Sequence, residues 1–257
     1  MPYLSNEPAV FYRVWNTECP KANVVFLHGA GEHSGLYHRF AAGLNAEGYR
    51  VWAIDHIAHG HTPGSVEAVY EVSALADNAR RLIRLAQEET DALKTVLIGN
   101  SLGGVTAGLL MSMEDAPAIA GLVLTSTPLA PLQNIDELDK AIMSLEPTYL
   151  DELASDPLLP RMEPLDYNRL DAAMCKAVEQ MQSKAPCWPF PVLLINGEND
   201  VLALPETARA WAKNIPRGRA LTVKGGHHDI LNDTSYAVVT RLIASFVLEA
   251  TNPYLLY

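Results

Sequence analysis

Cysteine is scarce in this chain of 257 residues, which contains only Cys19, Cys175 and Cys187. Three widely spaced cysteines cannot form the disulfide framework of a small secreted domain, and they do not have the spacing of a zinc cluster. We therefore expect free thiols and a fold that is stabilised by a hydrophobic core rather than by cross-links.

Basic residues are too few to balance the acidic ones. Nineteen Lys and Arg against 30 Asp and Glu give a formal net charge of −11. The basic residues are scattered, with no stripe that could follow a phosphate backbone or an anionic membrane surface. We expect no nucleic acid partner.

Long apolar runs are also absent. No run approaches the about 18 residues of a membrane-spanning helix, and residues 1–10 have no basic segment followed by an apolar core. We expect a soluble, cytoplasmic protein without stable membrane insertion. With 49% hydrophobic residues, the chain can bury a core compatible with one large domain plus an insertion.

Short apolar runs of strand length recur along the chain, and several are separated by helical patterns, notably Leu75–Ala86 and Ala237–Leu248. This alternation predicts an α/β fold with a mostly parallel sheet covered by helices. The predicted strands are Val10–Trp15, Val24–Leu27, Val51–Ile54, Thr95–Ile98, Leu122–Leu124, Val192–Ile195 and Ala220–Val223.

The alternation stops between Pro128 and Phe190, where no strand pattern occurs and prolines flank both ends. Such edges are typical of linkers between separately packed units. We predict a core over residues 1–127, an inserted helical cap over residues 128–190, and the rest of the core over residues 191–257. The cap contains two amphipathic helical stripes, one of Ile135, Leu138, Ile142 and Leu145 and the other of Leu170, Met174, Val178 and Met181.

The segment Gly99–Gly103 reads Gly-Asn-Ser-Leu-Gly and lies where the predicted strand Thr95–Ile98 gives way to a helical stretch of small residues. A serine on a sharp strand-to-helix turn presents its hydroxyl above the sheet edge, and flanking glycines leave room for the tight backbone. Ser101 is therefore a candidate nucleophile. A helix N-cap is the alternative, because serine is favoured there.

A serine hydroxyl becomes a nucleophile when a base removes its proton, and the base needs a third group to hold its tautomer. Two later predicted strands are followed by loops with such groups. The first loop holds Glu198 and Asp200, and the second holds His227 and His228. The order Ser, Asp, His, each on a loop after a strand, is that of an α/β-hydrolase. The spacing alone does not choose within either pair.

A glycine-rich turn, His28–His33, follows the predicted strand Val24–Leu27. Such a turn can expose the backbone N–H donors that stabilise the anionic oxygen of a tetrahedral intermediate. We assign this oxyanion hole to the amides of Ala30 and Leu102. Losing one such donor typically costs ~3 kcal/mol of transition-state stabilisation.

Asp55, His56, His59 and His61 form a second cluster, in which imidazoles and a carboxylate could coordinate zinc. A metal-dependent hydrolase is therefore an alternative function. Loop packing without a metal is the simpler interpretation of this cluster. We expect no metal and no cofactor.

The segment His28–Gly35, His-Gly-Ala-Gly-Glu-His-Ser-Gly, is followed by Tyr37 and is the most specific motif in the chain. Together with the turn at Ser101 and the stretch Pro191–Asp200, it resembles the monoglyceride lipase-like branch of the α/β-hydrolase superfamily, a serine aminopeptidase S33 or lysophospholipase type. The resemblance spans nearly the whole chain. It implies an α/β-hydrolase fold, with a mostly parallel central sheet flanked by helices and an inserted helical cap.

The resemblance selects Asp200 over Glu198 as the acid and His228 over His227 as the base. It also implies a serine hydrolase of the carboxylesterase or lipase type that needs no cofactor. Asp229, which follows the base, could be a ligand or a relay, but we interpret it as a helix-start carboxylate that faces the helix dipole.

Two positions depart from the family. Relatives usually have His before the nucleophile and Arg-Gly between the matches to Asp55 and His59, where this chain has Asn100, and Ile57 with Ala58. These departures concern the pocket wall and hence the substrate. The predicted cap holds five basic and 11 acidic residues, which disfavours anionic substrates near the entrance.

We expect a serine carboxylic-ester hydrolase that acts through an acyl-enzyme on a small neutral ester with an apolar acyl group, such as a monoacylglycerol. A thioesterase, lactonase or amidase on the same triad is the alternative, and a non-catalytic ligand receptor is a further one. Flexible thioethers of the cap can line an adaptable acyl pocket. The residues expected to contact the substrate are Gly29, Glu32, Asn100, Met143 and Met174.

Overall fold

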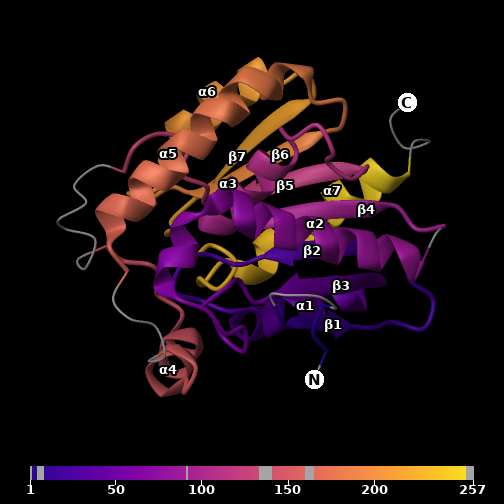
Figure 1. Cartoon of the computed structure of the whole chain (residues 1–257), viewed down its shortest axis with the longest axis horizontal. Helices are drawn as coiled ribbons and strands as arrows, with labels where there is room; N and C mark the ends of the chain where they lie inside the picture. Colours follow the sequence, from indigo (N-terminus) through magenta and orange to yellow (C-terminus); the bar gives the residue numbers. More distant parts are fainter. Residues whose placement is uncertain (1, 5–8, 91, 133–140, 160–164, 253–257) are drawn as a thin grey trace.

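The computed structural model describes residues 2–4, 9–90, 92–132, 141–159 and 165–252. Within these residues, seven strands form one sheet in the order β1-β3-β2-β4-β5-β6-β7 (Figure 1). β1 is antiparallel to β3, and all other neighbours are parallel. The α/β fold predicted from the sequence is therefore confirmed. The strands are β1 (Tyr12–Trp15), β2 (Ala22–Leu27), β3 (Tyr49–Ile54), β4 (Thr95–Asn100), β5 (Gly121–Thr125), β6 (Val192–Gly197) and β7 (Gly218–Val223).

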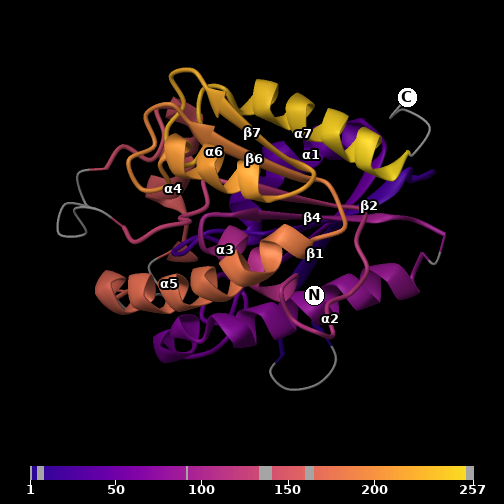
Figure 2. The ribbon, with the colours of Figure 1, turned by 90° about the horizontal axis from the view of Figure 1, so that it is seen from above.

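Helices cover both faces of the sheet, as the view from above shows (Figure 2). Apolar side chains of α2, α3, α5 and α6 pack on one face, and those of α1 and α7 pack on the other. All six residues of β2 are buried, because neighbouring side chains point into opposite layers. The helices named here are α1 (His38–Ala46), α2 (Val72–Glu88), α3 (Leu102–Leu110), α5 (Tyr167–Lys184), α6 (Pro205–Asn214) and α7 (Tyr236–Thr251).

The long helix of the predicted cap is α5, and its apolar stripe is buried as expected. Met174 and Met181 face the larger of the two cores, in which α5 packs against α3. The helices approach closely at Gly108, where a β-carbon would collide with Met181. The insertion thus shares a core with the sheet domain instead of packing separately.

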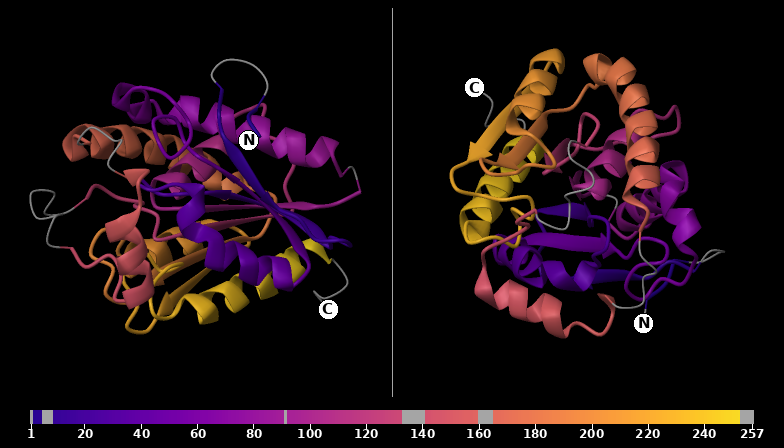
Figure 3. Two further views of the ribbon diagram at one scale, coloured as in Figure 1. Left: turned by 90° about the horizontal axis from the view of Figure 1, so that it is seen from below. Right: turned by 90° about the vertical axis from the view of Figure 1, so that its left-hand side faces the viewer.

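The first amphipathic stripe was predicted to be a helix, and that prediction is wrong where it can be examined. Ile135 and Leu138 lie outside the described residues, while residues 141–146 are not helical. Tertiary hydrogen bonds hold these residues instead: the Leu145 N–H donates to the Asp233 carboxylate at 2.9 Å. The helix begins only at Pro147, as α4 (Pro147–Ser155), which lies apart from α5 (Figure 3).

The three cysteines are free thiols, as expected from their spacing. In the described part of the chain, no helix is both long enough and apolar enough to cross a membrane. The three domain boundaries predicted from the sequence stay a prediction.

Candidate active site

Ser101 occupies the junction between β4 and α3 in a backbone conformation that side chains rarely adopt, with φ 50° and ψ −119°. Its hydroxyl makes no capping hydrogen bond to α3, which argues against the N-cap alternative. Only glycine fits at both ends of this tight turn. A β-carbon at Gly99 would overlap the carbonyl of Gly103, and one at Gly103 would overlap that of Leu27. The strain aims the hydroxyl away from the helix.

The serine hydroxyl is the first member of a continuous hydrogen-bonded chain. Its Oγ lies 3.0 Å from Nε2 of His228, and Nδ1 of His228 lies 2.9 Å from Oδ1 of Asp200. The same Oδ1 accepts the backbone N–H groups of Leu202 and Ala203, at 3.0 and 2.9 Å. Asp200 is thereby fixed in position, and it orients the imidazole toward the serine.

The two competing residues lie elsewhere. Glu198 is exposed, and its carboxylate accepts the backbone N–H of Gly225 at 2.9 Å. The ring of His227 pairs instead with Asp233, through Nδ1 and Oδ2 at 2.9 Å. The structure therefore brings Asp200 and His228, rather than their neighbours, to Ser101.

Two opposing effects set the pKa of His228. Burial disfavours the charged imidazolium and lowers the pKa, whereas the charge and hydrogen bond of Asp200 raise it. The attraction prevails, and the pKa is raised above its ordinary value of 6.5. A more basic imidazole is better suited to accept a proton from a hydroxyl.

Ala30 and Leu102 line the same pocket as Ser101 and His228. Within the described part of the chain, neither amide donates to another backbone or side-chain group. Both donors are thus unpaired, as an oxyanion hole requires.

The pocket beside Ser101 has a volume of about 100 Å³ and a mostly apolar lining. Of the five residues expected to contact substrate, Met143 and Met174 line it, and the other three do not. Most of the other lining residues could not be predicted from the sequence, because they carry no motif. Leu170 is the exception, because it shares the helical stripe of Met174. The remaining lining residues are Pro128, Leu132, Tyr167, Leu170 and Leu202.

Asn100 and Glu32 do not line the pocket, and their side chains hydrogen-bond to other groups. Asn100 is buried, and it donates from Nδ2 to the Tyr37 hydroxyl at 3.0 Å. That hydroxyl donates in turn to Oε2 of Glu32 at 2.6 Å, and the same oxygen accepts the Gly29 N–H at 2.9 Å. These side chains brace residues 29–32, the predicted oxyanion loop.

Two histidines at this cluster, His59 and the neighbouring His28, have no free ring lone pair. Nε2 of His59 accepts the Gly31 N–H at 3.0 Å, and Nε2 of His28 accepts the His56 N–H at 2.9 Å. Their Nδ1 atoms lie against backbone carbonyls. Burial lowers the pKa of His56 to about 3, with help from nearby His59. Among the described residues, no group of three or more His, Cys, Asp or Glu could hold a metal.

Asp229 does not start a helix, so that interpretation is wrong. The following helix, α7, begins only at Tyr236, and Asp229 is buried in the loop that carries His228. Burial, followed by the charge of Glu32, raises the pKa of its carboxyl well above the usual range. This acid therefore carries a proton more readily than an exposed aspartate does.

Comparison with known proteins places this site in a family. The profile of the serine aminopeptidase S33 family matches residues 18–145 and 126–235 of the chain. The chain belongs to this family. Within curated proteins, it is 23% identical to the monoacylglycerol lipase of Mycolicibacterium smegmatis over 266 residues, with 93% of each chain covered. It is 29% identical to the human monoglyceride lipase over 227 residues, covering 79% of this chain and 74% of that one.

Solved structures share the fold of this S33 family member. The monoacylglycerol lipase of Paleococcus ferrophilus superposes with a TM-score of 0.72 at 25% identity, covering 94% of this chain and 99% of that one. A soluble variant of the Saccharomyces cerevisiae monoglyceride lipase, in complex with a substrate analogue, superposes with a TM-score of 0.84 at 16% identity, covering 98% and 95%. The protein is a hydrolase with the α/β-hydrolase fold, and the resemblance read from its motifs is confirmed.

Proposed function

We propose that this protein is a serine carboxylic-ester hydrolase acting on a neutral ester with an apolar acyl group, such as a monoacylglycerol. The observation that carries the proposal is the chain of hydrogen bonds from Ser101 through His228 to Asp200, at the edge of an apolar pocket. The proposed catalytic residues are these three, with the amides of Ala30 and Leu102 as the oxyanion hole.

The first half of the reaction is acylation. Asp200 holds the proton of His228 on Nδ1, which leaves the lone pair on Nε2 facing the serine. As Oγ of Ser101 attacks the ester carbonyl, Nε2 takes the hydroxyl proton. The carbonyl oxygen becomes anionic and accepts hydrogen bonds from the two free amides. When the carbonyl re-forms, the bond to the alcohol breaks, and His228 returns the proton to the leaving oxygen.

The second half is deacylation by water. His228 removes a proton from a water molecule, whose oxygen attacks the carbonyl carbon of the acyl-serine. The same amides stabilise the second tetrahedral intermediate. Its collapse releases the carboxylic acid and returns the proton to Oγ of Ser101. Every proton in this cycle moves through His228, so no further cofactor is needed.

The substrate class rests on the pocket and on the relatives. Leucine and methionine side chains supply most of the lining beside Ser101, which favours an apolar acyl chain over a charged one. The acidic insertion adds repulsion against anionic substrates. The curated relatives described above are named for monoacylglycerols, which are neutral esters with one acyl chain.

The test is a comparison of hydrolysis rates across neutral esters of increasing acyl length, with monoacylglycerols included. Thioesters, lactones and anilides of matched acyl groups serve as competitors, and Ser101→Ala measures the background. We expect carboxylic esters to have the highest kcat/KM. Near-zero rates on all esters, or a preference for one of the other acyl groups, would overturn the proposed substrate class.

A further inference from the structure

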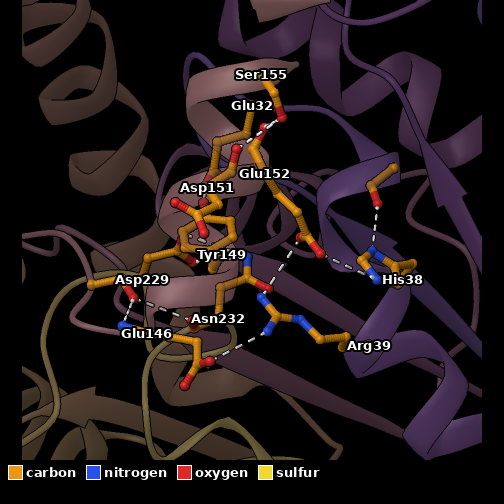
Figure 4. A network of polar contacts seen from close by, with 12 residues as sticks. Glu32, His38, Arg39, Glu146, Tyr149, Asp151, Glu152, Ser155, Asp229 and Asn232 are labelled. Carbon is orange, nitrogen blue, oxygen red and sulfur yellow. Dashed lines mark hydrogen bonds and ion pairs between the residues drawn. The ribbon is translucent and has the colours of Figure 1, made fainter.

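Two acidic side chains meet beside the catalytic residues without taking part in the proposed reaction. Glu32 ends the oxyanion loop, and Asp229 directly follows His228. Their carboxyl groups are hydrogen-bonded to each other, and both also contact the hydroxyl of Tyr149 on α4 (Figure 4). Asp229 is only 2% exposed, and Glu32 is half-buried. Two adjacent acids with so little access to water are costly unless something removes one of the charges.

A hydrogen bond between two carboxyl groups requires a proton on one of them, because two carboxylates are both acceptors. Glu32 already accepts three donors: the Tyr37 hydroxyl at 2.6 Å, the Gly29 N–H at 2.9 Å and the Tyr149 hydroxyl at 3.3 Å. This set of donors favours the charged form at Glu32. The proton therefore belongs on Asp229, whose carboxyl receives weak bonds of 3.4 Å from Asn232 and shares the Tyr149 hydroxyl with Glu32.

The cation beside Tyr149 is paired with other acids. The guanidinium of Arg39 lies 5.9 Å from the centre of the Tyr149 ring, but it is paired with Glu146 and Glu152 (Figure 4). The remaining titratable neighbours are the Tyr37 and Tyr149 hydroxyls, whose pKa values burial raises, and the imidazole of His228. A shared proton, rather than a salt bridge, is thus what keeps the two carboxyls together.

The pair joins the segments that hold the two halves of the catalytic machinery. Through Gly29, Glu32 fixes the loop that carries the Ala30 amide. Asp229 is covalently next to His228, and its backbone N–H donates to the Met143 carbonyl at 2.8 Å. The distance between the oxyanion donor and the imidazole is therefore set partly by the hydrogen bond between the two acids.

We propose that Glu32 and Asp229 act as one proton-sharing pair of positioning residues, which holds the oxyanion loop in register with His228. This inference rests on the proposed serine-esterase function and deepens it. While the proton is present, the pair ties the two loops together. When it is lost as the pH rises, two adjacent carboxylates repel each other, and the loops separate. The turnover of the wild type should then fall on the alkaline side.

The experiment measures kcat and KM against pH for the wild type, Asp229→Asn and Asp229→Ala on one neutral ester. The amide of D229N still donates to Glu32 but cannot ionise, so it should keep kcat near neutral pH within about twofold and lose the alkaline decline. D229A removes the donor, and it should lower kcat by about 10- to 100-fold with little change in KM, as expected for misplaced catalytic groups. Asp151→Asn, an exposed aspartate on α4, removes the same charge nearby and should leave the profile unchanged.

Two results would overturn the inference: a D229N profile with the alkaline decline of the wild type, or a D229N that is as impaired at neutral pH as D229A. Circular dichroism melts establish whether each variant folds, and D229N alone decides the question if D229A does not. Labelling by a fluorophosphonate separates the two proposals. If Ser101 is labelled and active while the variants behave as wild type, only the positioning role fails; if Ser101→Ala retains activity, the proposed function itself fails.

Discussion

Oγ of Ser101 and Nε2 of His228 lie 3.0 Å apart, although 127 positions separate the two residues along the chain. They meet because each follows the carboxyl end of a parallel strand, β4 for the serine and β7 for the histidine. Ligands of open α/β sheets bind at this edge. The geometry of the site is thus a consequence of the topology of the sheet.

Removing the charge that orients His228 should nearly abolish turnover. In Asp200→Asn, the amide can donate to Nδ1, which favours the wrong tautomer and takes the lone pair away from Ser101. We expect kcat to fall by about 10⁴-fold, with KM changed much less. Steady-state kinetics on a neutral ester measure this loss. Glu198→Gln is the matched control, and an equal loss there would contradict the assignment of the acid.

The decline of kcat/KM at low pH should reflect protonation of the His228 imidazole. Because the pKa of His228 is raised above 6.5, kcat/KM should decline as the pH falls through that raised value and the base becomes protonated. In D200N, the attraction of Asp200 is lost and burial dominates, which lowers the pKa of His228. The residual kcat/KM should therefore decline at a lower pH than in the wild type. An acid limb at the same pH in both proteins would assign the titration to another group.

The same shift predicts how stability depends on pH. A histidine whose pKa is higher in the folded state binds protons more tightly there. Its contribution to stability is complete below the unfolded pKa and disappears as the pH rises through the folded one. The free energies of unfolding in urea of the wild type and of His228→Gln should therefore diverge as the pH falls. Parallel curves across the range would show that no stabilising proton is bound there.

Asn100 should matter for stability more than for substrate choice. In Asn100→Ala, the Tyr37 hydroxyl loses a donor and the Thr125 hydroxyl loses an acceptor in a buried region. We expect about 1–3 kcal/mol of destabilisation in urea unfolding. Asn168→Ala, at an exposed position on α5, should change stability by less than about 0.5 kcal/mol. A changed acyl preference with unchanged stability in N100A would place this residue in the pocket.

Met174 should limit the length of the acyl chain. Met174→Ala enlarges the pocket and should shift the preferred ester toward longer chains, as measured by kcat/KM across acyl lengths. Met181→Ala makes the same change on the same helix, away from the pocket. Both should lose about 2–5 kcal/mol of stability. A shift in preference with M181A as well would indicate a general loosening of α5 rather than a lining role.

The sequence predicts the sheet well, because its strands are buried on both faces and appear as short apolar runs. The predicted strand Thr95–Ile98 is extended in the structure to Asn100, since pairing with β5 continues past the apolar residues. The loops after these strands bring Ser101, Asp200 and His228 together, as the motif order indicates. Local chemistry and topology agree at these positions.

Tertiary contacts explain what the sequence did not predict. Residues 141–146 have an apolar pattern, but hydrogen bonds to Asp229 and Asp233 hold them in a non-helical path. The hydrogen bonds of Asn100 could not be predicted from the sequence either, because its partners Tyr37 and Thr125 come from distant elements. The contact between Glu32 and Asp229 has no local signature at all. The cytoplasmic location expected from the composition stays a prediction.

The central claim is that Ser101 is the nucleophile, and intact-protein mass spectrometry with a fluorophosphonate tests it most directly. We predict one covalent adduct on the wild type, located at Ser101, with loss of esterase activity at the same rate. Ser101→Ala should show neither adduct nor activity, and a metal chelator should change neither result. An unlabelled wild type that nevertheless hydrolyses esters, or an S101A that retains activity, would contradict the account.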